Sequence, residues 1–468
     1  MTAARRPAKE EIVIEKIAPW VEGKRVLLLG FGREGRSTWE LLKELGVCRE
    51  VHVADQKEPE QIPEGIGAWI SGPEYQKCMD QYDVVFKSPG IVLERPQQEY
   101  RCRILSQTEV FFQCFRDQII GITGTKGKST TTTLVYHLLK EAGMDAMIAG
   151  NIGIPVFDRI REIHPDTKIV CELSCHQLEY MTVSPHIGVL VNIYEEHLDH
   201  YGTMEKYVEA KRRIYRNQKP GDILICNVQC LPEPGTCPSR LIRAELLEEG
   251  EQPERTEDRM EAAWVQGRSE LFWENETYVI PREEIRLQGR HNDFDIGIAY
   301  VICRLLGVDG QTFTDGLKSY EPLPHRLQLV GVKDGVKYYD DSISTICETT
   351  IQALQTLTDT DTVLIGGMDR GIDYTELIRF LSECPVPHIL LMEETGKRIR
   401  KEIWEDAGFK GKERLHLAEH LEDAVELARK LTRPGHSCLL SPAAASYGIF
   451  RNFEERGEVF TSLVMGRE

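Results

Sequence analysis

The stretch Ile119-Ile120-Gly121-Ile122-Thr123-Gly124-Thr125-Lys126-Gly127-Lys128-Ser129-Thr130-Thr131-Thr132 decides the fold of the middle of this chain. An apolar run ends in glycines, and leucines at helical spacing follow the Gly-Lys-Ser sequence. The pattern predicts a strand, a phosphate-binding loop and a helix, because glycines let backbone N–H groups converge on anionic oxygens. In such a loop Lys128 reaches the terminal phosphates and the Ser129 hydroxyl holds Mg²⁺. We therefore predict ATP binding, although the standard spacing needs glycine at position 122, which is Ile122.

Composition limits the classes of partner. The chain has 468 residues, which favours about three domains. Its net charge of −18 argues against nucleic acid or an anionic membrane as a general partner, so local cations must hold anionic substrates. We expect no membrane insertion, because no apolar run approaches the ~20 residues of a membrane span, and the first 15 residues lack an export signal. Thirteen cysteines without regular spacing indicate reduced thiols and a cytoplasmic location.

A second glycine-rich motif lies near the N-terminus. The apolar run 25–29 enters Gly30-Phe31-Gly32-Arg33-Glu34-Gly35, a helical stretch continues to Leu45, and the next strand ends at Asp55. These features predict a Rossmann-like domain over residues 1–105. The motif alone does not identify the ligand, because the same loop can hold any diphosphate. An NAD-dependent oxidoreductase is the alternative, but no obvious hydride-transfer residues follow.

Strands and helices then alternate in a predicted ATP-binding domain over residues 106–322. Strands are expected at 168–174, 188–193 and 222–226, with a helix over 207–215 that carries Lys211. This alternation predicts a parallel sheet with ligands at the carboxyl ends of its strands, where Glu172 and His197 lie. Residues 230–270 are Pro-rich and then acidic, and we interpret them as a surface insertion followed by short antiparallel strands.

A third α/β domain is predicted over residues 323–468, after a Pro-rich linker. Strands are expected near 337–342, 362–366, 388–392 and 438–442, and the second of them ends in Gly366-Gly367. A strand that ends in a glycine-rich turn also occurs in the first domain, so we predict another Rossmann-like fold.

Motifs along the chain together carry a family resemblance. In order they are Gly121–Ser129, Glu172-Leu-Ser-Cys-His-Gln-Leu-Glu179, Asn192 through His197-Leu-Asp199, Tyr207-Val-Glu-Ala-Lys211, Gly289-Arg-His-Asn292, His325-Arg326, Asp341-Ser342, Gly366-Gly-Met-Asp369, and Leu440–Ser446 with Asn452–Gly457. Each motif alone is weak, but their order and spacing are specific. Over essentially its whole length the chain resembles the Mur ligase family, and its final stretch is most similar to the glutamate-adding member.

The resemblance implies a three-domain ATP-dependent ligase of peptidoglycan precursor synthesis. The first domain holds the UDP end of a UDP-muramoyl-alanine substrate, the second holds ATP, and the third brings in glutamate. The substrate carboxylate attacks the γ-phosphate to give an acyl phosphate, and the amine of glutamate then displaces phosphate. D-glutamate is favoured and an L-glutamate-adding variant stays open. The resemblance also implies two Mg²⁺ sites, a monomeric protein and a cytoplasmic location.

The resemblance also assigns residues to the site. The catalytic set is Lys128, Glu172, His197 and Lys211. The ATP-binding set is Gly124, Thr125, Lys126, Gly127, Lys128, Ser129, Thr130, Asn292, Arg326 and Asp341. The UDP-substrate set is Gly32, Arg33, Asp55, Gln56, Ser88, Asn151 and Ser174, and the amino-acid set is Thr345, Arg370, Ser446, Tyr447 and Phe453. The metal set is Ser129, Glu172, His197 and the carbamate of Lys211; His197 could instead be the base for amine attack.

The sequence departs from the family pattern in two places. Asp295 stands where the family usually has a second asparagine, and this change affects the adenine side of the ATP site. Ile343 stands where the family has a lysine near the acyl-phosphate site, and Arg370 replaces another lysine that binds the incoming carboxylate. An arginine fork can hold a carboxylate bidentately, so it can partly replace the missing charge.

Other interpretations stay open beside the ligase. The chain could be a non-ligase nucleotide-binding relative, or a related ligase with a non-muramoyl acceptor such as folate. Cys226, Cys230 and Cys237 could bind zinc, but they lack a clear fourth ligand and the Cys-x-x-Cys spacing, so ordinary thiols are favoured.

Overall fold

The computed structural model describes residues 15–150, 154–196, 198–406 and 408–466. Its strands form three sheets within two compact units. The first unit contains the chain up to Ile285 together with Asn292–Tyr320, and the second contains Arg286–His291 and Glu321–Glu468. The predicted α/β fold class is confirmed.

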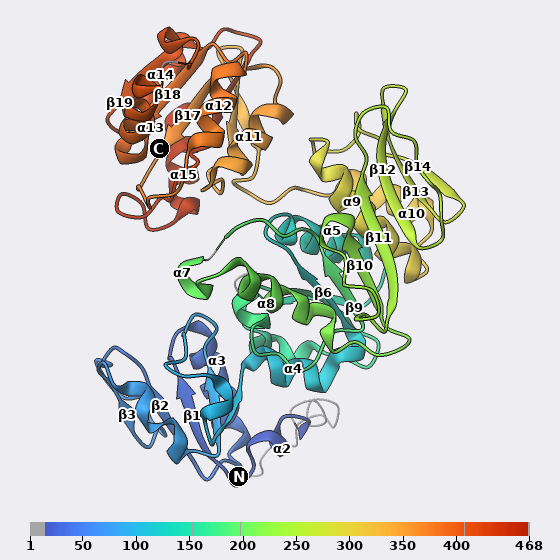
Figure 1. Ribbon diagram of the computed structural model, residues 1–468, viewed down its shortest axis with the longest axis vertical. Coiled ribbons are helices and arrows are strands. Elements are labelled where there is room, and N and C mark those ends of the chain that lie inside the picture. The colour runs from blue at the N-terminus through green and yellow to red at the C-terminus, as the bar shows by residue number, and fades with distance from the viewer. Residues whose placement is uncertain (1–14, 151–153, 197, 407, 467–468) are drawn as a thin grey trace, which may run out of the picture. The chain divides into compact units, whose positions relative to one another are not determined.

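The first sheet is five-stranded and parallel, in the order β3-β2-β1-β4-β5. Its strands are β1 (Arg25–Leu29), β2 (Glu50–Ala54), β3 (Trp69–Ile70), β4 (Val84–Lys87) and β5 (Arg103–Leu105). Helix α3 (Arg33–Leu45) packs against it, as the blue part of Figure 1 shows, and the short helix α2 spans Ala18–Val21. Apolar side chains of β1 are buried on both faces, which is typical of a parallel strand. The predicted strand, glycine loop and helix are therefore confirmed here.

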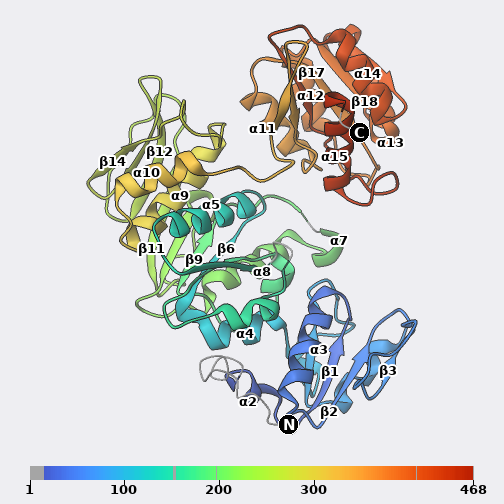
Figure 2. The same ribbon diagram turned by 180° about the vertical axis from the view of Figure 1, so that it is seen from behind.

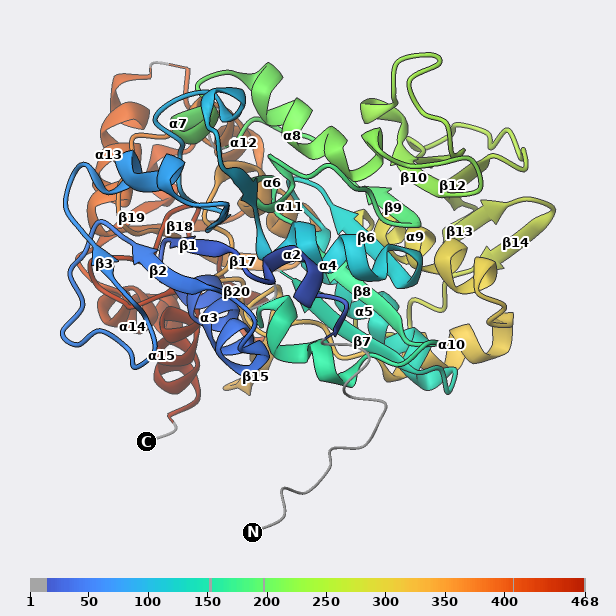
Figure 3. The ribbon, with the colours of Figure 1, turned by 90° about the horizontal axis from the view of Figure 1, so that it is seen from below.

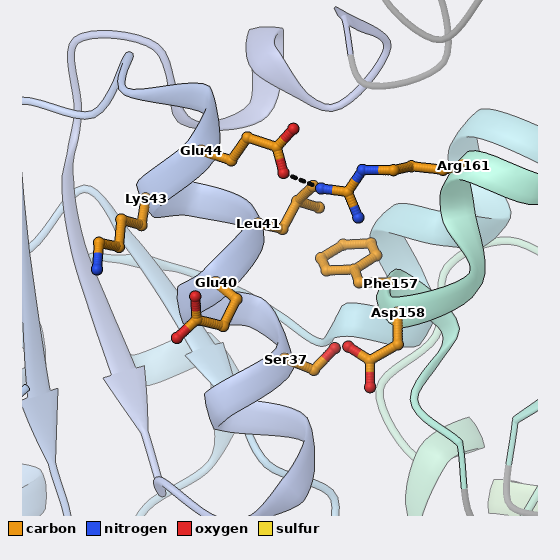
Figure 4. Close-up of a pocket in the computed structure, with 8 residues that line it drawn as sticks. All are labelled: Ser37, Glu40, Leu41, Lys43, Glu44, Phe157, Asp158 and Arg161. Atoms are coloured by element: carbon orange, nitrogen blue, oxygen red, sulfur yellow. Dashed lines mark hydrogen bonds and ion pairs between the residues drawn. The ribbon is translucent and has the colours of Figure 1, made fainter.

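Helix α3 also packs against the neighbouring part of the first unit. Figure 4 shows it facing the 3₁₀ helix η4 (Val156–Glu162), with Leu41 and Phe157 between them and an ion pair joining Glu44 to Arg161. A groove of about 440 Å³ lies between these two elements. Helix α4 (Gln107–Phe115) continues the same apolar core, which runs from the first sheet to the second.

The second sheet has nine strands in the order β14-β13-β12-β11-β10-β9-β6-β8-β7. Every neighbouring pair from β7 to β12 is parallel, and the β12–β13 and β13–β14 pairs are antiparallel. Their bounds are β6 (Ile119–Thr123), β7 (Ala146–Gly150), β8 (Lys168–Glu172), β9 (Ile187–Leu190), β10 (Ile223–Asn227), β11 (Arg240–Leu246), β12 (Arg259–Val265), β13 (Arg268–Trp273) and β14 (Glu276–Val279).

The interpretation of residues 230–270 as a surface insertion is wrong. Strands β11 and β12 from this segment extend the central sheet in parallel with β10. Ile242 and Met260 are buried there. Glu245 on β11 forms an ion pair with Arg259 on β12, so part of the acidic cluster is neutralised across the sheet. The antiparallel strands expected after it are confirmed as β13 and β14.

Helices cover the second sheet, and several lie near its carboxyl edge. Figure 2 shows α5 and α8 beside strands β6 and β9. The helices are α5 (Lys128–Glu141), α6 (Cys175–Leu178), α7 (Leu198–Tyr201), α8 (Met204–Arg216), α9 (His291–Leu305) and α10 (Gly310–Ser319). Helix α10 is bonded to α5 through His137, whose Nε2 lies 3.0 Å from the Gly316 carbonyl oxygen.

The second unit contains a six-stranded sheet in the order β15-β16-β20-β17-β18-β19. All neighbours are parallel except the β15–β16 pair. The strands are β15 (Gln328–Lys333), β16 (Val336–Asp340), β17 (Thr360–Gly366), β18 (His388–Met392), β19 (Leu415–Ala418) and β20 (Ser437–Leu440). The helices are α11 (Cys347–Thr356), α12 (Thr375–Glu383), α13 (Glu393–Glu405), α14 (Leu421–Leu431) and α15 (Phe453–Met465). Figure 3 shows α14 beside α15, and the two share a buried apolar cluster with β20.

Candidate active site

The loop between β6 and α5 has the shape that close approach of phosphate requires. Gly127, just before the helix, has φ of +78°, in the left-handed region that favours glycine. A Cβ atom there would lie 2.8 Å from Asp295 Oδ1, and one on Gly124 would lie 3.0 Å from the Val191 Cβ. A larger residue at either position would therefore require its neighbours to shift, Asp295 at position 127 and Val191 at position 124. The loop leads into the N-terminus of the 14-residue helix α5, a suitable place for an anion.

Asn192 fixes the conformation of this loop. Its side-chain Oδ1 accepts hydrogen bonds from the backbone N–H groups of Thr125, at 3.0 Å, and Lys126, at 2.8 Å. The Thr125 hydroxyl in turn lies 2.9 Å from the Tyr207 hydroxyl of α8. The motif that begins at Asn192 does not by itself indicate this role for the asparagine. A polar residue directly after a buried strand was the available signal.

Two lysines donate to backbone carbonyls of the loop. Lys128 Nζ donates to Thr125 O at 2.9 Å, and Lys211 Nζ donates to Gly124 O at 2.6 Å. Lys211 is only 1% exposed. Its burial, assisted by repulsion from the Lys128 charge, lowers the pKa of Lys211 to about 7. A large fraction of its amine is therefore neutral near neutral pH, so Lys211 is not an ordinary solvated lysine.

Oxygen donors of the predicted metal set lie on both sides of this loop. Glu172 ends β8 beside β6 and is 2% exposed, and Ser129 is in the first turn of α5. A carboxylate and a hydroxyl are ligands that suit Mg²⁺. His197 lies outside the described residues. No group of three or more histidine, cysteine, aspartate or glutamate side chains suited to a metal occurs within the described ranges.

The N-terminus of α9 lies against the same loop. Asp295 Oδ1 accepts a hydrogen bond of 2.9 Å from the Thr131 hydroxyl of α5. Asn292 precedes Asp295 by three residues, which places both on one face of α9. Asp295, noted as a departure on the adenine side, therefore contacts the helix that follows the phosphate loop.

A pocket of about 620 Å³ opens at the carboxyl end of the first sheet. Five of the seven residues predicted to bind the UDP end line it: Gly32, Arg33, Asp55, Gln56 and Ser88. The Asp55 carboxylate accepts from Phe31 N at 2.8 Å and Lys57 N at 3.0 Å, so it holds the glycine loop against the end of β2.

The other two residues predicted for the UDP substrate are elsewhere. Asn151 lies outside the described residues. Ser174 does not line the pocket; it is the N-cap of α6 and forms a capping box with Gln177. The Gln177 side chain donates to Glu34 Oε1 at 3.0 Å, and Glu34 does line the pocket. Ser174 is thus connected to the pocket through two side chains.

In the second unit, Asp341 is buried after the end of β16. Its carboxylate accepts from the Ser441 hydroxyl at 2.7 Å and from Leu327 N at 3.1 Å. Burial raises the pKa of Asp341 to about 6, against the opposing effects of these hydrogen bonds and the Arg326 charge. The structure therefore brings Asp341 and Arg326 close enough to interact.

The predicted amino-acid residues also lie in this unit. Arg370 Nη2 donates to the Thr345 carbonyl oxygen at 3.1 Å. An isolated bridge pairs Met368 with Ala445, next to Ser446 and the exposed Tyr447. The Phe453 ring lies 6.2 Å from the His325 ring. The loops at 345, 370 and 446 thus meet, while Phe453 lies beside His325.

Arg456 supports these loops, and sequence reasoning gave it no role. It is completely buried, and its Nη2 donates to the carbonyl oxygens of Ser342, at 2.8 Å, and Ala444, at 3.0 Å. The pKa of Arg456 is lowered to about 10 by burial, although the Glu393, Asp340 and Asp341 charges oppose that shift. An arginine inside the last apolar helix was the signal that could have indicated it.

The thiols considered for zinc are placed as ordinary side chains. Cys226 is buried, and its Sγ donates to the Cys230 carbonyl oxygen at 3.3 Å. Cys237 Sγ lies 3.0 Å from the Ser239 hydroxyl. In this described segment the three cysteines do not form a three-ligand metal group. No helix among the described residues is long and apolar enough to cross a bilayer.

Comparison with known proteins gives concordant matches. A model of the Mur ligase middle domain matches residues 122–292. The UDP-N-acetylmuramoylalanine–D-glutamate ligase of Geobacillus kaustophilus is 34% identical over 454 residues, covering 94% of this chain and 97% of the relative. The enzyme of that name from Symbiobacterium thermophilum is 34% identical over 402 residues, covering 84% of this chain and 86% of the relative.

Solved structures match the fold over nearly the whole chain. MurF from Acinetobacter baumannii has a TM-score of 0.60 and 16% identity, covering 95% of this chain and 91% of that one. The UDP-N-acetylmuramate-alanine ligase MurC from Thermotoga maritima has a TM-score of 0.56 and 16% identity, covering 95% of this chain and 100% of that one. At this identity the likeness shows the fold alone.

Proposed function

The chain belongs to the Mur ligase family, and from that premise we propose that it adds D-glutamate to UDP-N-acetylmuramoyl-L-alanine at the expense of ATP. The names of relatives that are 34% identical over most of their length support this substrate pair. The observation that carries the proposal is structural. One compact unit holds a phosphate loop and, separately, a glycine-lined pocket suited to a nucleoside diphosphate.

The reaction proceeds in two steps. The acceptor carboxylate attacks the γ-phosphorus of ATP, which releases ADP and leaves an acyl phosphate. The neutral amine of glutamate then attacks the acyl carbon and passes one proton to a base, phosphate leaves, and an amide bond remains. Lys128 and the N-terminus of α5 stabilise the charge that develops on the transferred phosphoryl group.

The predicted residue roles form part of the proposal. Residues 1–105 hold the UDP end, 106–322 hold ATP, and 323–468 supply the glutamate site. Asn292, Arg326 and Asp341 are further proposed ATP-binding residues. Thr345, Arg370, Ser446, Tyr447 and Phe453 are the proposed amino-acid-binding residues, among which the Arg370 fork suits a carboxylate.

Mg²⁺ fits the oxygen-donor set at the phosphate loop. Ser129, Glu172 and a carbamate on Lys211 are its proposed ligands in this chain, with His197 as a further one. When bound, the metal neutralises phosphate charge so that two anions can approach. A neutral buried amine can react with CO₂ to give that carbamate, and the position of Lys211 against Gly124 O would bring the resulting anion beside the loop.

Product formation tests the proposal. Purified protein, ATP and Mg²⁺ are incubated with UDP-N-acetylmuramoyl-L-alanine and either D- or L-glutamate, and the amide product is identified by mass spectrometry. Phosphate release that needs both acceptor and D-glutamate supports the proposal. Product with L-glutamate alone overturns the stereochemistry, and phosphate release without acceptor or amino acid indicates a non-ligase nucleotidase. We place the reaction in the cytoplasm and expect a monomer, which light scattering tests.

A further inference from the structure

Lys87 is a buried lysine at the end of β4, and the residue roles proposed above do not use it. It is 4% exposed. Its Nζ donates to the carbonyl oxygens of Ser88, at 3.2 Å, and Pro89, at 3.1 Å. Both residues line the 620 Å³ pocket, whereas Lys87 does not. Burying an ammonium group costs free energy unless neighbouring groups compensate its charge. The neighbours of Lys87 therefore indicate what the residue does.

Groups from the second sheet's domain and from α3 of the first face the same ammonium. The Tyr180 ring centroid lies 5.0 Å from Lys87 Nζ. The carboxylates of Glu179, next to Tyr180, and of Glu34, on α3, attract the Lys87 charge. Tyr180 and Glu179 directly follow α6, whose first residue is three positions after Glu172. Lys87 therefore lies between the pocket wall and the segment that carries the proposed metal ligand.

A second link runs parallel to this one. Gln177 on α6 donates to Glu34 Oε1 at 3.0 Å, and Glu34 lines the pocket. The segment 172–180 thus contacts the pocket walls at two places, through Glu34 and through Lys87. Movement of the Ser88-Pro89 wall would change both the pocket and its distance from the phosphate loop.

We propose that Lys87 is a positioning residue, which fixes the Ser88-Pro89 wall of the nucleotide pocket relative to the 172–180 segment and so sets the affinity for the nucleotide-linked acceptor. This inference rests on the proposed function, because it assigns the acceptor's UDP end to that pocket. Lys87 acts through backbone carbonyls and is not itself a catalytic residue.

The protonation of Lys87 gives the inference a pH signature. Burial lowers the pKa of Lys87 to about 8, although Glu179 and Glu34 oppose that shift. The facing groups are Glu34 from α3, with Glu179 and Tyr180 from the segment after α6. The ammonium is charged below about pH 8 and neutral above it. The KM for the acceptor should therefore be low at pH 7 and should rise by pH 9.5.

Three variants test the inference: Lys87→Met, Lys87→Arg, and the control Lys77→Met. Lys77 is an exposed lysine of the same domain, paired with Glu74. The KM values for UDP-N-acetylmuramoyl-L-alanine, ATP and D-glutamate are measured at pH 7 and 9.5, with melting temperatures as a check of folding. Lys87→Met should raise the acceptor KM about tenfold at pH 7, the effect of losing hydrogen bonds from a charged donor, with less than a twofold change for ATP.

Comparing the acceptor KM at pH 7 and pH 9.5 distinguishes the proposed positioning role of Lys87 from a merely structural role. The acceptor KM of the unsubstituted protein should rise toward that of Lys87→Met at pH 9.5, while Lys87→Arg stays within about twofold because guanidinium remains charged. An unchanged acceptor KM in Lys87→Met, or equal pH dependence in Lys87→Arg and the unsubstituted protein, overturns the inference. If Lys87→Met does not fold, the Lys87→Arg comparison still decides. Absence of product from the unsubstituted protein refutes the proposed function instead.

Discussion

The Asp341 carboxyl group is buried at the end of β16, and its pKa is raised to about 6 mainly by burial. A carboxyl whose pKa is higher in the folded protein binds its proton more tightly there than in the unfolded chain. Its contribution to stability is favourable at low pH and is lost as the pH rises through about 6. The difference of about two pKa units corresponds to about 3 kcal/mol at pH 8.

We predict that Asp341→Asn increases the free energy of unfolding at pH 8, by about 1–3 kcal/mol, and changes it little or unfavourably at pH 4. The amide removes the buried charge and keeps one oxygen to accept from Leu327 N, while its NH2 group faces the Ser441 hydroxyl, which can turn to accept from it. Urea denaturation at the two pH values measures the effect. Asp309→Asn is the opposite-sign control, because hydrogen bonds at the α10 N-cap lower the pKa of Asp309. Equal stabilisation at both pH values contradicts the argument.

Lys211 should be needed for turnover rather than for folding. We predict that Lys211→Met lowers kcat at least about 100-fold, a loss of about 3 kcal/mol of transition-state stabilisation, while ADP still binds. Lys206→Met, an exposed lysine on the same helix, is the matched control and should be unchanged. Product formation and calorimetric ADP binding measure the two properties. Full turnover in the Lys211 variant rules out its proposed role.

The neighbours of some residues can be predicted from the sequence, and those of others cannot. Gly124 to Ser129 form a contiguous motif, so their common position followed directly from the sequence. The compensation of Lys87 by Glu34, Tyr180 and two carbonyls arises from three segments far apart along the chain. No local pattern reports such a tertiary arrangement. A lysine inside an apolar strand is a signal that a partner exists, but it does not identify the partner.

At the scale of elements, the ends of β7 and β8 fit together closely. Gly150 ends β7 with φ of +94°, and a Cβ atom there would lie 2.1 Å from the Glu172 carbonyl oxygen. We predict that Gly150→Ala lowers the free energy of unfolding by more than about 4 kcal/mol, because backbone must move. Gly143→Ala, with φ of +73° and open space around it, should lose only about 1–2 kcal/mol. Urea denaturation compares them; equal losses would show that the clash is relieved locally.

Elements with continuous apolar runs were predictable, and those with mixed composition were not. Strands β1, β6 and β8 are buried on both faces, so their runs are long and unambiguous. Strands β11 and β12 carry charged residues, and their pairing depends on cross-strand contacts such as Glu245 with Arg259. Glu261 on β12 is itself buried beside Arg259, at 3.0 Å. In the sequence alone, the acidic residues of β11 and β12 therefore look like those of a solvated loop.

At the scale of the whole molecule, the net charge of −18 opposes the approach of anionic substrates. Salt screens this repulsion, with a Debye length near 10 Å at 0.1 M. We predict that kcat/KM for ATP, at constant free Mg²⁺, is unchanged or rises up to about threefold between 10 and 100 mM KCl. Steady-state kinetics measure it. A tenfold fall would show that local cations such as Lys126 and Lys128 dominate the field that ATP meets.

The chain passes between the two units three times: after Ile285, after His291 and after Tyr320. The segment between the second and third crossings includes α9 and α10, which are packed into the first unit. Cleavage of the backbone after Ile285 would thus leave a C-terminal fragment with its own sheet at one end and an embedded helical pair at the other. Such a nicked molecule should migrate as one species on a native gel and as two bands after denaturation. Because α9 and α10 are packed within the first unit, they would hold the C-terminal fragment in place even after that peptide bond is cut.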